Sequence, residues 1–458
     1  MRSRSLPSFL VTAALGASCG GGAASPEDGP RPPDVVLILL DTLRADALSA
    51  YGNEHETAPY LARLAAGGTV FETAYSVSTW TAPSTASLLT GVYPDRHGVT
   101  RGFVAQFREG EPVHEDRLPD LELLAIARET PTLAERFREL GYRTFGLASN
   151  VNVGPEMEFE RGFDRFERHD LRPAKELRQH LLEWQDEIRS TDDPCFVYLH
   201  FNDVHQPYDL RPRWYRPGEN RKRGKEDRAR YESELGYLDF FLARIHEDLG
   251  VDEDTLLVVA SDHGEEFFDH GGFFHDFTLY VELSWIPLVV HAPGLRVAPG
   301  RARGNVSLID VAPTIFDLCG LPVPGDLDGR SLAPLCWAAD KGAPVDRLVA
   351  ELDERPLFLH RLEDDVHLWG VIHGDWKLIR APEGDLLFDR ATDPREQTNL
   401  APERPEVVER LAALLASHVG RGSNPSSTRT NVEIDEDLLR RLREAGYVGG
   451  DDEDDGGD

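Results

Sequence analysis

Two aspartates and a histidine stand directly after apolar runs of the chain, where they could act together. Asp41 closes the run "DVVLILLD", and Asp262 and His263 follow the run "TLLVVAS". Two carboxylates and an imidazole form a suitable ligand set for a divalent cation. Taken singly, Asp41 could cap a following helix and "SDHG" could be an ordinary turn. Taken together, the three residues predict a metal site.

The stretch "TWTAPSTASLLTG" places a hydroxyl at the start of a predicted helix. Pro83 suits the first turn of a helix, so Thr81 falls at or just before the helix N-terminus. The helix dipole and free N–H groups favour anions there. One interpretation is that Thr81 or Ser84 simply caps the helix. The other is that the predicted metal also contacts Thr81 and turns its hydroxyl into a nucleophile, as zinc lowers the pKa of water from about 15.7 to about 7.

The segments that must hold these side chains alternate between two patterns. Buried strands are predicted by "DVVLILLD", "YRTFGLASN", "CFVYLHFNDVH", "TLLVVASDHGEE" and "IPLVVHAPG", and helices by "APYLARLAAGG", "TPTLAERFRELG", "YESELGYLDFFLARIHEDLG" and "SLIDVAPTIFDLCG". This alternation predicts an α/β fold with a doubly wound, largely parallel sheet flanked by helices. Functional groups gather beyond the carboxyl ends of the strands in such a fold. We therefore expect the following residues to lie together: Asp41, Asp203, His205, Asp262 and His263.

The C-terminal part of the chain has a different pattern. From about Val345, "HLWGVIHGDWKLIR" and "GDLLFDRATDP" predict antiparallel strands in a small α+β subdomain, and "DEDLLRRLREAGYVGG" predicts a short helix. The expected divisions are a signal and flexible tether over 1–33, a catalytic domain over 34–340, a C-terminal subdomain over 341–448 and an acidic disordered tail over 449–458.

The charge of the chain excludes one class of partner. Its 458 residues carry a formal net charge of −32, which would repel the phosphates of nucleic acid.

Among the cysteines, Cys319 and Cys336 could form a disulfide in an oxidising compartment or remain buried free thiols. No cysteine has the spacing of a structural zinc site.

The N-terminus predicts export. Two arginines, a short apolar run and small residues precede Cys19, which is the layout of an export signal and is too short to span a bilayer. Cys19 and the glycines after it resemble the lipidation point of bacterial lipoproteins. We expect a periplasmic or outer-surface protein whose only attachment to the membrane is a lipid anchor at Cys19.

Ordered motifs from about Pro33 to Leu400 resemble the sulfatase-like branch of the alkaline phosphatase superfamily. They include "VVLILLDTLRADALSAYG", "TWTAPSTASLLTGVYPDRHGV", "LHFNDVHQPY", "SDHGEEFFDHGGFFHD" and "LFDRATDPREQTNLA". The resemblance implies one divalent ion, calcium, manganese or zinc, with a second ion as an alternative. It also implies a small-molecule, glycan or lipid ester as substrate. The implied metal ligands are Asp41, Thr81, Asp262 and His263.

The same resemblance assigns roles to several histidines. It places a substrate-binding histidine at His205, and His275 near the position where sulfatases carry a lysine that contacts the charged ester. His275 could bind the anion, protonate a leaving group or ligate a second metal, and His270 could be a further ligand. His97 and Arg44 are expected to orient their neighbours.

Departures from the sulfatase pattern change the expected chemistry. Thr42 replaces a second acid, Thr85 replaces an arginine, and the Gly-Lys-Trp-His motif is absent. Above all, Thr81 stands where sulfatases have the Cys or Ser that becomes formylglycine, and threonine is not a substrate for that oxidation. No formylglycine is expected, and a threonine sulfate lacks the exit by which formylglycine hydrate expels sulfate.

The sequence therefore predicts a metal-dependent hydrolase of phosphate, phosphonate or sulfate esters with Thr81 as nucleophile, phosphoryl or phosphonyl transfer being the easier chemistry. One alternative is a transferase that passes a phosphoryl group to an acceptor alcohol. Another is a catalytically silent anion-binding homologue.

Overall fold

The computed structural model describes residues 31–103, 121–189, 192–217, 223–275, 277–337, 343–363, 366–419, 428–432 and 435–444. The predicted signal with Cys19 and the acidic tail lie outside these ranges. All described helices and strands belong to one unit, Pro32–Asp458. No helix in these ranges is long and apolar enough to cross a membrane.

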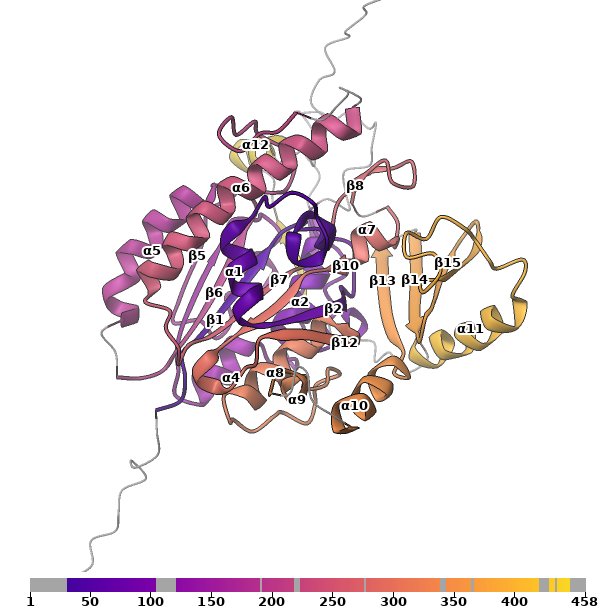
Figure 1. The fold of residues 1–458 in the computed structure, drawn as a ribbon. Helices are drawn as coiled ribbons and strands as arrows, with labels where there is room; N and C mark the ends of the chain where they lie inside the picture. The colour runs from indigo at the N-terminus through magenta and orange to yellow at the C-terminus, as the bar shows by residue number, and fades with distance from the viewer. Residues whose placement is uncertain are drawn as a thin grey trace, which may run out of the picture. The chain divides into compact units, whose positions relative to one another are not determined.

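Over the described ranges, nine strands form the main sheet, with β1 near its centre (Figure 1). β1 pairs in parallel with β6 and β7, and β6, β4 and β5 continue in parallel. β11, β2 and β10 extend the other side through antiparallel pairs, and β12 runs parallel to β2. The strands are β1 (Val35–Leu40), β2 (Thr69–Tyr75), β4 (Arg143–Ala148), β5 (Arg165–Arg168), β6 (Cys195–Phe201), β7 (Leu256–Ser261), β10 (Trp285–Ile286), β11 (Leu288–His291) and β12 (Gly300–Ser307). The predicted α/β fold with a largely parallel sheet is confirmed.

Apolar side chains cover both faces of this sheet. Alternate residues of β1 enter two different cores, Val35 and Leu37 on one face and Val36 and Ile38 on the other. This two-sided burial explains why β1 is a continuous apolar run rather than an alternating one. One core contains residues of α1 (Pro59–Gly67), α5 (Ala174–Arg189) and α6 (Arg223–Leu249). The other contains residues of α2 (Thr81–Thr90), α4 (Leu133–Glu139), α8 (Val311–Leu318) and α9 (Ala333–Trp337).

A four-stranded antiparallel sheet follows in the C-terminal part, in the order β13-β14-β15-β16. Its elements are β13 (Leu357–Glu363), β14 (Val366–His373), β15 (Trp376–Ala381) and β16 (Gly384–Asp389), with α10 (Ala343–Asp353) before them and α11 (Pro405–Val419) after them. Leu411 and Leu415 of α11 pack on this sheet. The predicted antiparallel subdomain is confirmed.

The chain then returns to the main body. β17 (Thr428–Val432) pairs with β3 (Leu121–Ala125), and α12 (Glu436–Glu444) buries leucines in the core around α2. The terminal helix is as predicted. The division at 340/341 stays a prediction.

Of the two states predicted for Cys319 and Cys336, a disulfide or buried thiols, the structure shows the thiols. Cys319 and Cys336 are free, with Cys195 a further free thiol. Burial raises the pKa of the Cys319 and Cys336 thiols to about 12. A disulfide between them is therefore wrong, and these thiols stay protonated and unreactive.

Candidate functional site

The three predicted metal ligands meet beyond the ends of β1 and β7. Asp41, Asp262 and His263 are fully buried, and one ligand atom from each lies within 4.8 Å of the others. His263 Nε2 is 3.8 Å from Asp41 Oδ1 and 3.5 Å from Asp262 Oδ2. None of these three atoms has a hydrogen-bond partner among the described residues. Buried polar atoms are normally satisfied, so three facing acceptors without donors fit a cation between them.

The remaining atoms of the ligands are held by hydrogen bonds. Asp262 Oδ1 accepts from the backbone N–H groups of Thr42, at 3.1 Å, and His263, at 2.8 Å. His263 Nδ1 lies 2.9 Å from the carbonyl oxygen of Gly264, which can only accept, so Nδ1 carries the proton. Nε2 therefore presents a lone pair to the site, as a metal-binding imidazole must.

Thr42 explains the missing second acid. Its backbone adopts a left-handed conformation, with φ of 54°, and its hydroxyl donates to the carbonyl oxygen of Val204 at 2.8 Å. The side chain is thus directed to a backbone carbonyl rather than offered to the three ligands. The ligand set is completed without it.

The electrostatics also favour a cation. Burial, and next the charge of Asp262, raises the pKa of Asp41 well above its usual value. Burial likewise raises the pKa of Asp262 to about 7 and lowers that of His263 well below 6.5. The imidazole is therefore neutral at pH 7, and the two carboxylates need a nearby positive charge in order to ionise together.

Thr81 is the first residue of α2, as predicted, and is only 1% exposed. The N-cap residue, Trp80, is extended, and within the described ranges no side-chain cap hydrogen bond forms at this helix end. The uncapped N–H groups can bind the oxygens of an anion. The Thr81 side chain is close enough to Asp41 to act against burial, which still raises the pKa of that carboxyl overall. A hydroxyl, a helix N-terminus and the predicted metal ligands therefore adjoin one another.

His205 and His275 lie beside the ligand cluster. The ring of His275 is 4.6 Å from that of His263 and 5.0 Å from that of His205, between centroids. His275 Nδ1 is 3.0 Å from Glu265 Oε1, and Tyr208 donates to the other oxygen of Glu265 at 2.7 Å. Burial, and next His275, lowers the pKa of His205 to about 4. Glu265 was not predicted, although it lies in the same motif as His263.

A further group of polar side chains surrounds Asp41. Asn150 donates from Nδ2 to Asp41 Oδ2 at 2.7 Å, and His200 Nε2 lies 3.5 Å from the same oxygen. Both ring nitrogens of His200 and the hydroxyls of Tyr198 and Thr85 are buried and have no hydrogen-bond partner in the part of the chain that the structure describes. The signal that could have revealed Tyr198 and His200 is a polar group at every second position of an otherwise apolar strand.

Two residues singled out in the sequence, Asp203 and His270, are engaged in other hydrogen bonds. Both carboxylate oxygens of Asp203 accept from the backbone N–H of Ala174, the first residue of α5, so Asp203 caps that helix. His270 contacts Glu282 through Nδ1 at 2.7 Å and the carbonyl of Glu396 through Nε2 at 3.0 Å. With both ring nitrogens engaged, His270 is not placed to be a metal ligand. The contact that the structure shows for Asp203 is thus a helix cap, and its expected place near Asp41 and His263 stays a prediction.

Arg44 and His97 support the site, as expected. Arg44 donates to Asp46, to Asp269 and to the carbonyl of Glu265, which joins the loop after β1 to the loop after β7. His97, in α3 (Pro94–His97), accepts from the N–H of Val99 through Nδ1, so its Nε2–H donates to Ser87 of α2 at 2.9 Å. Both residues thus fix elements that carry the ligands and Thr81.

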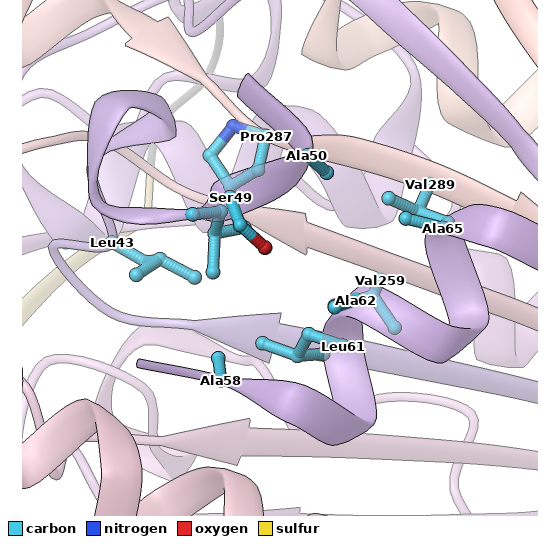
Figure 2. A pocket seen from close by; sticks show the side chains of 11 residues that line it. Leu43, Ser49, Ala50, Ala58, Leu61, Ala62, Ala65, Val259, Pro287 and Val289 are labelled. Carbon is cyan, nitrogen blue, oxygen red and sulfur yellow. The ribbon is translucent and has the colours of Figure 1, made fainter. Parts of the chain in front are cut away.

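A cavity lies close to Leu43 but does not suit a substrate (Figure 2). Its walls are almost entirely aliphatic, including Leu61, Val259 and Val289, and its volume of about 10 Å³ admits at most one water molecule. A charged ester could not bind there.

Comparison with known proteins identifies the family. The family model for sulfatases matches residues 33–321, and that for the C-terminal region of N-sulphoglucosamine sulphohydrolase matches residues 269–419. The chain therefore belongs to the sulfatase family, in the alkaline phosphatase superfamily. It is an enzyme of the class that hydrolyses sulfuric or phosphoric esters, and members of this family are metal-dependent.

Individual relatives agree with this assignment. Arylsulfatase A of Homo sapiens is 28% identical, over 86% of this chain and 92% of the relative. The phosphonate monoester hydrolase of Agrobacterium radiobacter has a similar fold, with a TM-score of 0.64 and 21% identity, over 88% of this chain and 98% of that one. A protein solved with its substrate, D-glucosamine-2-N,6-O-disulfate, has a TM-score of 0.66 and 18% identity, over 87% of this chain and 99% of that one.

Proposed function

We propose that the enzyme hydrolyses phosphate or phosphonate esters through Thr81, with a divalent cation held by Asp41, Asp262, His263 and the Thr81 hydroxyl. The observation that carries the proposal is the set of three buried, unpartnered ligand atoms beside an uncapped helix N-terminus that begins with this threonine. A bound cation would lower the pKa of the hydroxyl and balance the carboxylate charges.

Other groups of the chain would bind the ester and transfer the protons in this reaction. The N–H groups at the start of α2 and the imidazole of His205 bind the non-bridging oxygens of the ester. Thr81 Oγ1 bonds to phosphorus as the bond to the leaving oxygen breaks. The proton of Thr81 passes to solvent, and His275 supplies one to the leaving oxygen. Glu265 orients His275 through Nδ1. Water then attacks phosphorus and releases Thr81 with phosphate or phosphonate.

The identity of residue 81 favours phosphorus over sulfur. Without formylglycine, a sulfated enzyme has no aldehyde-forming exit, whereas a phosphothreonine can be attacked at phosphorus. Calcium, manganese and zinc remain candidates for the cation. A second ion near His205, His275 and Glu265 is an alternative.

The other finer predictions belong to the same proposal. The substrate would be a small-molecule, glycan or lipid ester. Of the proteins compared above, one is named a phosphonate monoester hydrolase and one was solved with a sulfated sugar as its substrate, which supports an ester of this general kind. Export, a periplasmic or outer-surface location and a lipid anchor at Cys19 follow from the N-terminal sequence alone. Transfer to an acceptor alcohol in place of water remains the competing activity.

The test is a panel of aryl phosphate, phosphodiester, phosphonate and sulfate esters assayed with the wild type and Thr81→Ala. We expect turnover of a phosphorus ester that falls by at least about 10³-fold in Thr81→Ala. Thr90→Ala is the matched control and should keep its activity, because Thr90 lies at the other end of α2 and its hydroxyl donates to the carbonyl of Ala86. Sulfatase activity that survives Thr81→Ala would refute the proposal.

A further inference from the structure

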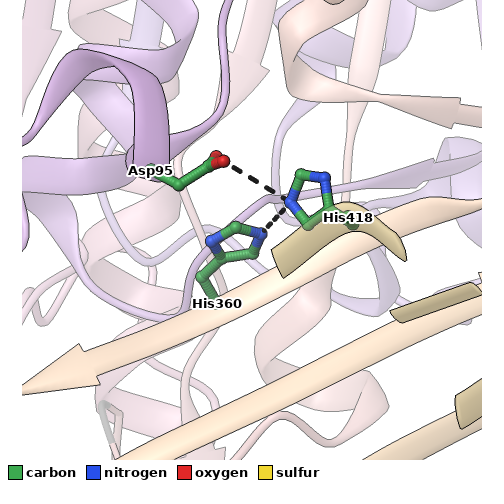
Figure 3. A group of neighbouring side chains, drawn as sticks. All are labelled: Asp95, His360 and His418. Carbon is green, nitrogen blue, oxygen red and sulfur yellow. Dashed lines mark hydrogen bonds and ion pairs between the residues drawn. The ribbon is translucent and has the colours of Figure 1, made fainter. Parts of the chain in front are cut away.

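A second cluster of ligand-type side chains lies between the main body and the C-terminal sheet (Figure 3). Asp95 comes from α3, His360 from β13 and His418 from the last turn of α11. One ligand atom of each lies within 4.8 Å of the others. His418 Nε2 is 2.8 Å from His360 Nε2 and 3.8 Å from Asp95 Oδ1. Segments far apart in the sequence thus converge on one point.

The three side chains are shielded and their rings are fixed. His360 is 1% exposed, and the side chains of His418 and Asp95 are 11% and 14% exposed. Tyr93 stacks on His360 with an angle of 2° between the planes, and Phe358 stacks on His418 at 3.9 Å with an angle of 3°. These aromatic rings hold both imidazoles with their Nε2 atoms facing each other.

The contacts among these three side chains leave one carboxylate oxygen, Asp95 Oδ1, without a hydrogen-bond donor from the cluster. Two facing neutral imidazole nitrogens can share only one proton and so make one hydrogen bond. Asp95 Oδ1, directed at the same point, is buried and has no hydrogen-bond partner among the residues that the structure describes. A buried carboxylate oxygen without a donor is costly unless a cation is present.

The spacing suits a small, imidazole-preferring cation. Ligand atoms about 2.0 to 2.1 Å from a tetrahedral zinc ion lie about 3.3 Å from each other. The separations of 2.8 Å and 3.8 Å measured from His418 Nε2 lie on either side of this value, and the third pair of ligand atoms lies within 4.8 Å. Calcium and magnesium prefer oxygen-only ligand sets, whereas two imidazoles and a carboxylate suit zinc.

We propose that Asp95, His360 and His418 bind a zinc ion, with water as the fourth ligand, that ties the C-terminal sheet to the helices around Thr81. The backbone N–H of His360 donates to the carbonyl of Val77 at 2.7 Å, just before α2. On the other side, His97 of α3 donates to Ser87 within α2. The ion would therefore brace both ends of the segment that positions Thr81. This site is separate from the proposed catalytic cation and does not depend on the reaction proposed above.

Metal content in a background without the catalytic site tests the proposal. The full chain with Asp41→Asn and Asp262→Asn is stripped of metal with a chelator and then loaded with zinc. Gel filtration removes the unbound zinc, and elemental mass spectrometry measures the zinc that remains bound. We expect about one zinc ion per chain. Adding His418→Gln should remove it, whereas adding His55→Gln, at an exposed loop residue, should not.

Cobalt(II) and stability provide independent measurements. Cobalt loading of the same background should give visible absorption bands that His418→Gln abolishes and that Asp95→Asn weakens, with at least about tenfold lower affinity. Zinc should raise the urea midpoint of the background and of the His55→Gln control only. No zinc bound by the folded background, or zinc retained after His418→Gln, would overturn the proposal. If His418→Gln does not fold, the Asp95→Asn affinity decides.

Discussion

Replacing Asp262 by asparagine should stabilise the metal-free protein while it removes cation binding. Burial, the largest cause, raises the pKa of Asp262 from 3.8 to about 7. An asparagine could keep its oxygen for the N–H groups of Thr42 and His263. Its amide nitrogen would then face Asp41 Oδ1 and His263 Nε2, which both lack a donor. The substitution removes a buried charge and supplies the missing hydrogen bonds.

The size of the effect follows from the pKa shift. An acid whose pKa rises on folding destabilises the folded state as pH rises above the unfolded pKa, and the cost stops growing above the folded pKa. A rise from 3.8 to about 7 corresponds to about 4 kcal/mol at pH 8 and about 2 kcal/mol at pH 5. The stability advantage of Asp262→Asn should therefore shrink by about 2–3 kcal/mol between pH 8 and pH 5.

Urea unfolding with chelator present measures this difference, and titration calorimetry measures cation binding. Asp346→Asn, whose side chain is 74% exposed, is the matched control and should stay within about 0.5 kcal/mol of the wild type at both pH values. The reasoning is refuted if metal-free Asp262→Asn is less stable than the wild type at pH 8, or if its advantage grows as the pH falls.

Two further substitutions test the surroundings of the site. Asn150→Leu removes the 2.7 Å hydrogen bond to Asp41 and should weaken cation affinity by about 10- to 100-fold in calorimetry; unchanged affinity would contradict the role of Asn150. The Glu282 carboxylate acts against desolvation to raise the pKa of His270, so Glu282→Gln should lower that pKa in an NMR titration. The stability gained from charged His270 is present below pH 6.5 and is lost as pH rises through the raised pKa; an unmoved titration in Glu282→Gln would show that the ion pair is absent.

The central strands and the convergence of Asp41, Asp262 and His263 could be predicted from the sequence because both depend on local patterns. A parallel strand buried on two faces leaves a continuous apolar run, and residues that follow such runs meet at one edge of the sheet. Asp41, Asp262 and His263 obey this rule and converge. Asp203 obeys the same rule but turns to cap α5, because the end of a strand fixes where the chain emerges and not which way a side chain points.

The rest depends on contacts between distant segments. β11 has the apolar pattern of a parallel strand but pairs antiparallel with β7. The direction of a strand depends on the connection between it and its neighbours rather than on its own residues. The side chain of Asn150 forms a hydrogen bond with Asp41, which lies 109 residues away in the sequence. No local spacing in the sequence predicts such a pair. The cluster of Asp95, His360 and His418 is similarly assembled from three separate elements and carries no motif.

The most direct measurement of the central claim is chemical trapping of the nucleophile. The enzyme is mixed with its best aryl phosphate substrate, quenched in acid during turnover, digested and analysed by mass spectrometry. The account predicts a phosphoryl group on the Thr81 hydroxyl in the peptide that contains "TWTAPSTASLLTG", and none in Thr81→Ala. A phosphoryl group on another residue, or undiminished turnover by Thr81→Ala, would contradict it.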